Sequence, residues 1–160
     1  MNTAEMGIDN LTLSVVQEIH VNASLETTFE ALLEQLGPGN AQSDGTLMPM
    51  KLEAWPGGRW YRDLGEGNGH FWGHVQAIKR PALLEIVGPL FMSYPVASNV
   101  QYRLSKTESG TLIQFHHSAL GLILEDHKKG VIKGWSSIHE RARKAAEARA
   151  SLVAGHGKTQ

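Results

Sequence analysis

The sequence of 160 residues contains no cysteine. This absence excludes disulfide bonds, thiol nucleophiles, CxxC redox chemistry and cysteine-rich zinc sites. It is also compatible with a reducing compartment, so we expect a cytoplasmic location.

The chain also lacks long apolar runs and a surplus of basic charge. No apolar run approaches the roughly 18 residues of a membrane-spanning helix, and the start, MNTAEMGIDNLTLS, lacks the features of a signal peptide. The formal net charge is -1, and the basic residues are spread along the chain, which argues against a nucleic-acid partner. The length fits one domain, expected over residues 11–150, with flexible termini at 1–10 and 151–160.

Apolar periodicity predicts two helices that flank a run of strands. The first helix follows Ser24, which can cap it, and ends before Gly37. Strand-like patterns occupy residues 11–21, 50–64 (broken by a turn at 56–58), 70–78, 82–88, 98–104 and 111–118. This order indicates an α+β fold with an antiparallel sheet.

The last helix, expected over residues 127–150, organises the chain. Its apolar face consists of Val131, Trp135, Ile138, Ala142, Ala145 and Ala146. Gly130 and Gly134 fall on the same side, where each glycine costs a helix about 1 kcal/mol, so we expect a close approach of the backbone to another element. We therefore predict that this helix lies across a curved sheet and roofs a cavity. The alanines either interdigitate with bulky side chains or leave space in this cavity, and the sequence leaves both alternatives open.

The glycine cluster at residues 65–69, GEGNG, superficially resembles a dinucleotide-binding loop. A strand follows it, whereas a phosphate-binding loop must open a helix, so no nucleotide and no other cofactor is expected. The sequence has no nucleophile elbow of the GxSxG kind. Glu53 and Glu85 are expected within strands, at an edge or facing solvent.

Eight histidines raise the question of a metal site. On one strand face, His70 and His74 would lie about 13 Å apart, too far to share one ion. His116 and His117 are adjacent and point to opposite faces. Neither pair predicts a metal site, although a tertiary site that combines His117 with His74 or His139 stays open.

Aromatic residues on several elements suggest a ligand pocket. His117 shares strand parity with Ile113 and Phe115 and is expected to point inward, either as a satisfied core residue or as a polar contact for a ligand. The candidate ligand-binding residues are Trp60, Trp72, Tyr102, His117 and Trp135. Ordinary core packing of the aromatic side chains is the alternative, and the residue pattern leaves it open.

Several strings occur in the order that is typical of one superfamily. They are VVQEIHVNAS with ETTFEALLEQL, EAWPGGRWY, GHVQAIKRPALLEIVG, NVQYRLSKTESGTLIQFHHSALG, and Gly134-Trp135 in the last helix. From Leu11 to Ala150 the chain resembles the SRPBCC (START, birch-pollen-allergen-like) superfamily, in particular the branch similar to the activator of heat-shock-protein-90 ATPase (AHSA-like). The resemblance implies a helix-grip fold, in which a curved antiparallel sheet of six or seven strands wraps around a long C-terminal helix with an internal cavity.

Members of this superfamily bind hydrophobic small molecules or lipids, cyclise polyketides or assist a chaperone. The expected function is therefore binding of a small, mostly hydrophobic ligand, either lipid-like or an aromatic metabolite. Two alternatives stay open: an enzyme of the cyclase, dehydratase or hydrolase type with His117 as acid or base, and an interaction protein that modulates a chaperone ATPase.

Two segments depart from the family pattern, namely the stretch between Leu36 and Met48 and the helix after Trp135. Both are expected to border the cavity, so the ligand of another family member does not carry over to this chain. The apolar segment GPLFMSYPV at residues 88–96 is interpreted as either a pocket lid or a contact in a homodimer, and the sequence does not decide between the two roles.

Overall fold

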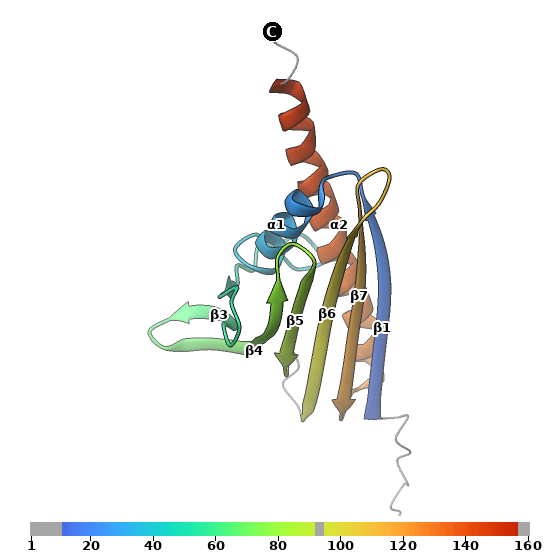
Figure 1. Ribbon diagram of the computed structural model, residues 1–160. Helices are drawn as coiled ribbons and strands as arrows, with labels where there is room; N and C mark the ends of the chain where they lie inside the picture. Colours follow the sequence, from blue (N-terminus) through green and yellow to red (C-terminus); the bar gives the residue numbers. More distant parts are fainter. Residues whose placement is uncertain (1–10, 92–94, 157–160) are drawn as a thin grey trace, which may run out of the picture.

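A single seven-stranded antiparallel sheet and two helices make up the computed structural model, which describes residues 11–91 and 95–156 (Figure 1). In chain order the elements are β1 (Thr12–Val21), α1 (Leu25–Leu36), β2 (Lys51–Leu52), β3 (Arg59–Gly65), β4 (Asn68–Lys79), β5 (Leu83–Gly88), β6 (Val96–Lys106), β7 (Thr111–Gly121) and α2 (Glu125–His156). The strands lie in the order β1-β7-β6-β5-β4-β3-β2, and α2 runs across one face of the sheet. The predicted α+β helix-grip fold is confirmed.

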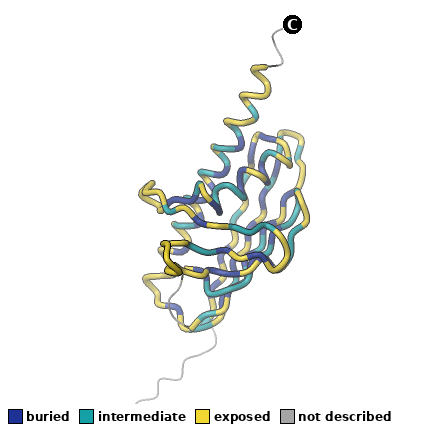
Figure 2. The backbone as a smooth tube through the Cα atoms, turned by 90° about the vertical axis from the view of Figure 1, so that its left-hand side faces the viewer, coloured by how far each residue is buried: buried dark blue, intermediate teal, exposed yellow. Residues whose placement is uncertain are grey.

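Side-chain alternation explains which face of the sheet α2 covers. Tyr102 on β6 pairs with Phe115 on β7, and Val100 pairs with His117; all four side chains are buried. His116, which lies between Phe115 and His117 in the sequence, is exposed. The inward orientation predicted for His117 is therefore correct, and Figure 2 shows the same alternation of buried and exposed positions along the strands.

The first helix closes one end of the sheet and packs against α2. Ser24 caps it as predicted, because its hydroxyl accepts a hydrogen bond from the amide of Thr27. At the other end, the carbonyl of Leu36 accepts a hydrogen bond of 2.7 Å from the indole Nε1 of Trp60. This contact satisfies one of the last carbonyls of α1, which have no partner inside the helix.

The middle of the chain differs from the prediction. Only Lys51–Leu52 forms a strand before the turn at residues 56–58, and Glu53 lies outside any strand, where it accepts hydrogen bonds from the backbone and guanidinium of Arg59. Glu85 does lie in β5 and accepts a hydrogen bond from Gln101. The segment around Glu53 turns back instead of extending because its hydrogen bonds close a loop onto Arg59.

The long helix α2 begins two residues before its predicted start and continues six residues beyond its predicted end, through residue 156. Glu125 and Asp126 occupy its first turn, where negative charge is favourable. No proline interrupts the alanine-rich end, so the helix extends through Ser151, in the stretch predicted to be a flexible terminus. No helix in the described ranges is long and apolar enough to cross a membrane.

Candidate ligand pocket

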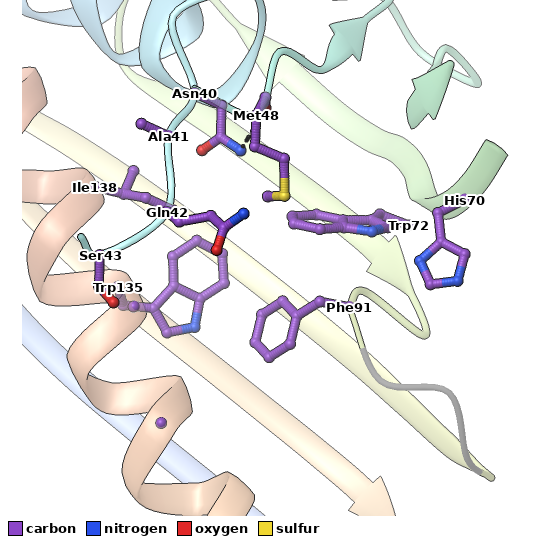
Figure 3. Close-up of a pocket in the computed structure, with 12 residues that line it drawn as sticks. Asn40, Ala41, Gln42, Ser43, Met48, His70, Trp72, Phe91, Trp135 and Ile138 are labelled. Carbon is purple, nitrogen blue, oxygen red and sulfur yellow. Dashed lines mark hydrogen bonds between the residues drawn. The ribbon is translucent and has the colours of Figure 1, made fainter. Parts of the chain in front are cut away.

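A pocket of about 490 Å³ lies between α2, β4 and the loop that joins α1 to β2 (Figure 3). Its inner wall is aromatic: Trp72 from β4 is 6% exposed and Trp135 from α2 is 1% exposed. Phe91, which is 37% exposed, lies between them and contacts both rings edge-on, with centroid distances of 5.6 and 6.3 Å. The pocket therefore has a buried aromatic wall and an exposed rim.

The loop between α1 and β2 forms the opposite wall through residues 40–43 and Met48. Asn40 organises this loop: its backbone carbonyl accepts a hydrogen bond from the amide of Met48, and its side-chain Nδ2 donates to the Met48 carbonyl at 3.1 Å. Ala41 and Leu47 form an isolated β-bridge. The stretch between Leu36 and Met48, which departs from the family pattern, thus contains a tight hairpin that closes one side of the pocket.

Arg141 of α2 holds this hairpin in place. Its guanidinium donates to the carbonyl of Ala41 at 2.6 Å, to the carbonyl of Gln42 at 3.3 Å and to Ser137 Oγ at 2.7 Å. Arg141 forms no ion pair within the described residues, and its partial burial lowers the pKa of the guanidinium below its ordinary value. The side chain therefore works as a fork of hydrogen-bond donors that joins the loop to the helix.

Replacing Arg141 by lysine is expected to loosen this wall of the pocket. An ammonium group lacks the planar fork that reaches two carbonyls, so we expect a loss of about 1–2 kcal/mol in the free energy of unfolding. Hydrogen exchange of the backbone amides in residues 41–48 should speed up. Arg143→Lys is the matched control, because Arg143 pairs with Glu140 and Glu147 on the solvent side of the same helix. Equal exchange rates in both variants would contradict the conclusion that Arg141 holds the hairpin in place.

Gly130 and Gly134 of α2 do not serve the purpose that the sequence suggested. A Cβ atom placed on Gly130 or Gly134 would meet nothing within 4 Å, so neither glycine permits a close approach of backbones. Both residues line the pocket instead. The missing side chains leave open volume in front of Trp135, which explains why helix-destabilising residues occur here.

The alanine face lies elsewhere. Ala142 and Ala146 are 1% and 0% exposed and belong to the core, and neither lines the pocket. Of the two alternatives for the alanines, close packing in the core is therefore the one that the structure shows for Ala142 and Ala146. Small side chains on the second half of α2 let it pack against other elements, whereas the cavity borders its first half.

The five candidate residues occupy two layers. Trp72 and Trp135 line the pocket, while Trp60, Tyr102 and His117 are fully buried behind it. Trp60 packs against Trp72 edge-on, with ring centroids 4.9 Å apart. Tyr102 donates its hydroxyl proton to His139 Nε2 at 3.0 Å. The inner three residues thus support the wall and do not touch the pocket volume.

His117 fixes the orientation of Trp135. The indole Nε1 of Trp135 donates to His117 Nδ1 at 3.0 Å, so the ring proton of His117 resides on Nε2, which donates to Ser98 Oγ at 3.0 Å. Burial, with a smaller contribution from the neighbouring His116, lowers the pKa of His117 to about 4. His117 is therefore a neutral ring with both nitrogens engaged.

His139, whose role the sequence did not indicate, makes a parallel set of contacts. Its ring stacks on Trp135 at a centroid distance of 5.9 Å and an interplanar angle of 14°. Because Gln17 Oε1 can only accept, Nδ1 of His139 carries the proton and donates at 2.6 Å, and Nε2 of the neutral ring accepts from the Tyr102 hydroxyl. Burial lowers the pKa of His139 to about 3. Two neutral histidines thus bracket the tryptophan that forms the pocket wall.

Sequence reasoning missed most of the outer half of the pocket. The additional lining residues are Asn40, Ala41, Gln42, Ser43, Met48, His70, Phe91, Gly130, Gly134 and Ile138. A signal existed for three groups: the stretch between Leu36 and Met48 departs from the family pattern, Phe91 belongs to the apolar segment at 88–96, and Gly130, Gly134 and Ile138 lie on the helix face predicted to roof the cavity. Residues 92–94 of that segment lie outside the described residues.

The titratable groups do not gather into a metal site. The described ranges contain no group of three or more histidine or acidic side chains that could hold a metal ion. His70 lines the exposed rim of the pocket, and Nδ1 of His74 contacts the carbonyl of Gly57.

Comparison with known proteins finds similarity in structure only. No protein-family model matches the sequence, and no curated protein matches it. Protein MLL2253 from Mesorhizobium loti is 19% identical, with a TM-score of 0.64 over 85% of this chain and 98% of that one. An AHSA1-like protein from Aeromonas hydrophila is 18% identical, with a TM-score of 0.60 over 86% of this chain and 94% of that one.

A third similar structure is the di-domain ARO/CYC StfQ from the steffimycin biosynthetic pathway. It is 13% identical, with a TM-score of 0.62, and the match covers 92% of this chain and 53% of StfQ. At these identities the similarity establishes the fold. The chain therefore has the helix-grip fold that its resemblance to the SRPBCC superfamily and the AHSA-like branch implied.

Proposed function

We propose that this protein binds a small, mostly apolar ligand in the pocket between the sheet and α2. The observation that carries the proposal is the lining itself: Trp72, Phe91 and Trp135 form one wall, and Gly130 and Gly134 leave the helix side open. A volume of about 490 Å³ falls within the range of roughly 300–1,000 Å³ that is typical of small-molecule sites. The membership of StfQ in a biosynthetic pathway is consistent with this use of the fold.

The surroundings of His117 favour binding over catalysis by this residue. Both of its ring nitrogens have partners inside the core, and the residue does not line the pocket. A general acid or base must come within hydrogen-bond reach of the reacting group. His117 therefore acts in the proposal as a positioning residue for Trp135, and the chaperone alternative rests on the family resemblance alone.

Filling the pocket from the helix tests the proposal. In Gly134→Leu the new side chain enters the open volume, and helix propensity improves, so the protein should stay folded and bind 2-ethylnaphthalene at least about tenfold more weakly. Gly155→Leu is the matched control, because Gly155 is in the same helix, has open space around it and lies outside the pocket.

The readout is the thermal unfolding of each variant with and without probe, supported by equilibrium dialysis. Bound probe at a hundredfold excess over its dissociation constant should add about 2.7 kcal/mol to the free energy of unfolding of the unsubstituted protein and of Gly155→Leu. Equal binding by Gly134→Leu, or no response of the unsubstituted protein to 2-ethylnaphthalene and related apolar probes, contradicts the proposal.

A further inference from the structure

The pocket has no buried charge with which to receive an anion. Its lining residues include no lysine, arginine, aspartate or glutamate, and the one titratable member, His70, lies at the exposed rim. Arg62 pairs with His70 across β3 and β4 but does not line the pocket. Because transfer of an unpaired carboxylate out of water costs several kcal/mol, the inner pocket disfavours a fatty acid or any other anionic group.

Two buried polar atoms of the lining have no hydrogen-bond partner among the described residues. One is the indole Nε1 of Trp72, a donor, and the other is Oδ1 of Asn40, an acceptor. Trp72 is 6% exposed and Asn40 is 0% exposed. They come from opposite walls of the pocket, β4 and the loop hairpin (Figure 3).

The contrast with Trp60 and Trp135 makes Trp72 informative. The indole N–H of Trp60 donates to the carbonyl of Leu36, and that of Trp135 donates to His117. Both indoles therefore have a hydrogen-bond acceptor within the protein. A buried polar group without a partner costs about 1–3 kcal/mol, and a ligand that supplies the partner recovers this energy. Phe91 packs edge-on against the Trp72 ring and is the most exposed aromatic side chain of the wall, so this part of the wall borders solvent.

We infer that the pocket selects an uncharged aromatic ligand that carries a hydrogen-bond acceptor, such as a carbonyl oxygen, for Trp72 Nε1 and a hydroxyl donor for Asn40 Oδ1. This inference rests on the proposed binding function and adds the chemical class of the ligand. Planar aromatic character follows from the walls, since Trp72, Phe91 and Trp135 offer faces and edges to another ring. Neutrality follows from the absence of any charged lining residue.

Four probes that share the naphthalene ring separate the contributions of the ketone oxygen, the hydroxyl group and the negative charge. They are 2-ethylnaphthalene, 2-acetylnaphthalene, 6-hydroxy-2-acetylnaphthalene and naphthalene-2-carboxylate, measured by equilibrium dialysis at neutral pH. One recovered hydrogen bond should make the ketone bind about 3–10-fold more tightly than the ethyl compound, and the hydroxyl should add a similar factor. The carboxylate should bind at least about tenfold more weakly than the ketone.

Trp72→Phe keeps an aromatic ring and removes the donor. The affinities for 2-acetylnaphthalene and 2-ethylnaphthalene should then be about equal, even if the smaller ring weakens the binding of both. Trp55→Phe is the matched control, because Trp55 is 58% exposed and lies outside the pocket, and it should keep the tighter binding of 2-acetylnaphthalene.

The outcomes separate the two levels of the proposal. Failure of all four probes to bind overturns the binding function itself. Binding of 2-ethylnaphthalene with no advantage for the ketone, an advantage that survives in Trp72→Phe, or binding of the carboxylate as tight as that of the ketone overturns the ligand class and leaves the binding function standing.

Discussion

Lowering the pH from 7.5 to 5 is expected to remove about 4 kcal/mol from the free energy of unfolding, about 2 kcal/mol for each of two buried histidines. The pKa of His117 is lowered to about 4 and that of His139 to about 3. The unfolded chain binds these protons below about pH 6.5, whereas the folded protein does not. Acid therefore favours the unfolded state, and the loss begins near pH 6.5 and continues to about pH 3–4.

The main physical cause is burial, because protonation would place a charged ring out of water at both positions. At His117 the direction of the hydrogen bonds adds to this cost. Its Nδ1 accepts from the Trp135 indole, which can only donate, so a proton on that nitrogen would make two donors face each other. Both effects act in the same direction.

Urea unfolding at a series of pH values between 7.5 and 5 measures this loss. His117→Gln keeps an acceptor and a donor but does not titrate, so the slope of stability against pH should fall by about half. His116→Gln, at the exposed neighbouring position, is the control and should leave most of the slope in place. The pKa of Glu53, lowered to about 2, affects stability only below about pH 4.5 and thus outside this window. A flat profile in the unsubstituted protein would disprove the neutral-histidine assignment.

Replacing Trp135 by alanine is expected to lower the free energy of unfolding by about 3–5 kcal/mol. The indole is 1% exposed and packs against Phe91, Phe115 and both buried histidines, with centroid distances from 4.7 to 6.3 Å. Truncation leaves a cavity among these rings and also removes the donor to His117 Nδ1. An effect of this size is a large part of the stability of an ordinary domain.

The variant Trp135→Phe separates the packing of Trp135 from its hydrogen bond, and Trp55→Ala is the control. Trp135→Phe keeps most of the ring contacts and loses the donor, so a smaller decrease of about 1–3 kcal/mol is expected from the unpaired His117 nitrogen. Trp55→Ala, at an exposed position, should cost less than about 1 kcal/mol. Equal losses for Trp135→Ala and Trp55→Ala in urea unfolding would contradict the central position of Trp135.

The elements of this fold could be predicted from the sequence because their signals are local. The spacing of Leu25, Phe29 and Leu32 marks the amphipathic first helix, and Ser24 marks its start. Alternation places His117 inward and His116 outward without any knowledge of the partner strands. A side chain's position within its own strand or helix depends on backbone period alone, and this period is readable from the sequence.

The site depended on tertiary structure, since its residues come from four separate segments. The sequence alone could select tryptophans as candidates but could not separate Trp72 and Trp135, which line the pocket, from Trp60 and Tyr102, which support the wall from behind. It marked Gly134 as unusual, yet only the packing of α2 decided that this glycine faces open volume and not another backbone. Whether a buried polar atom finds a partner depends on groups that are distant in the chain. For that reason only the fold decided that Trp135 is satisfied by His117 while Trp72 Nε1 has no partner among the described residues.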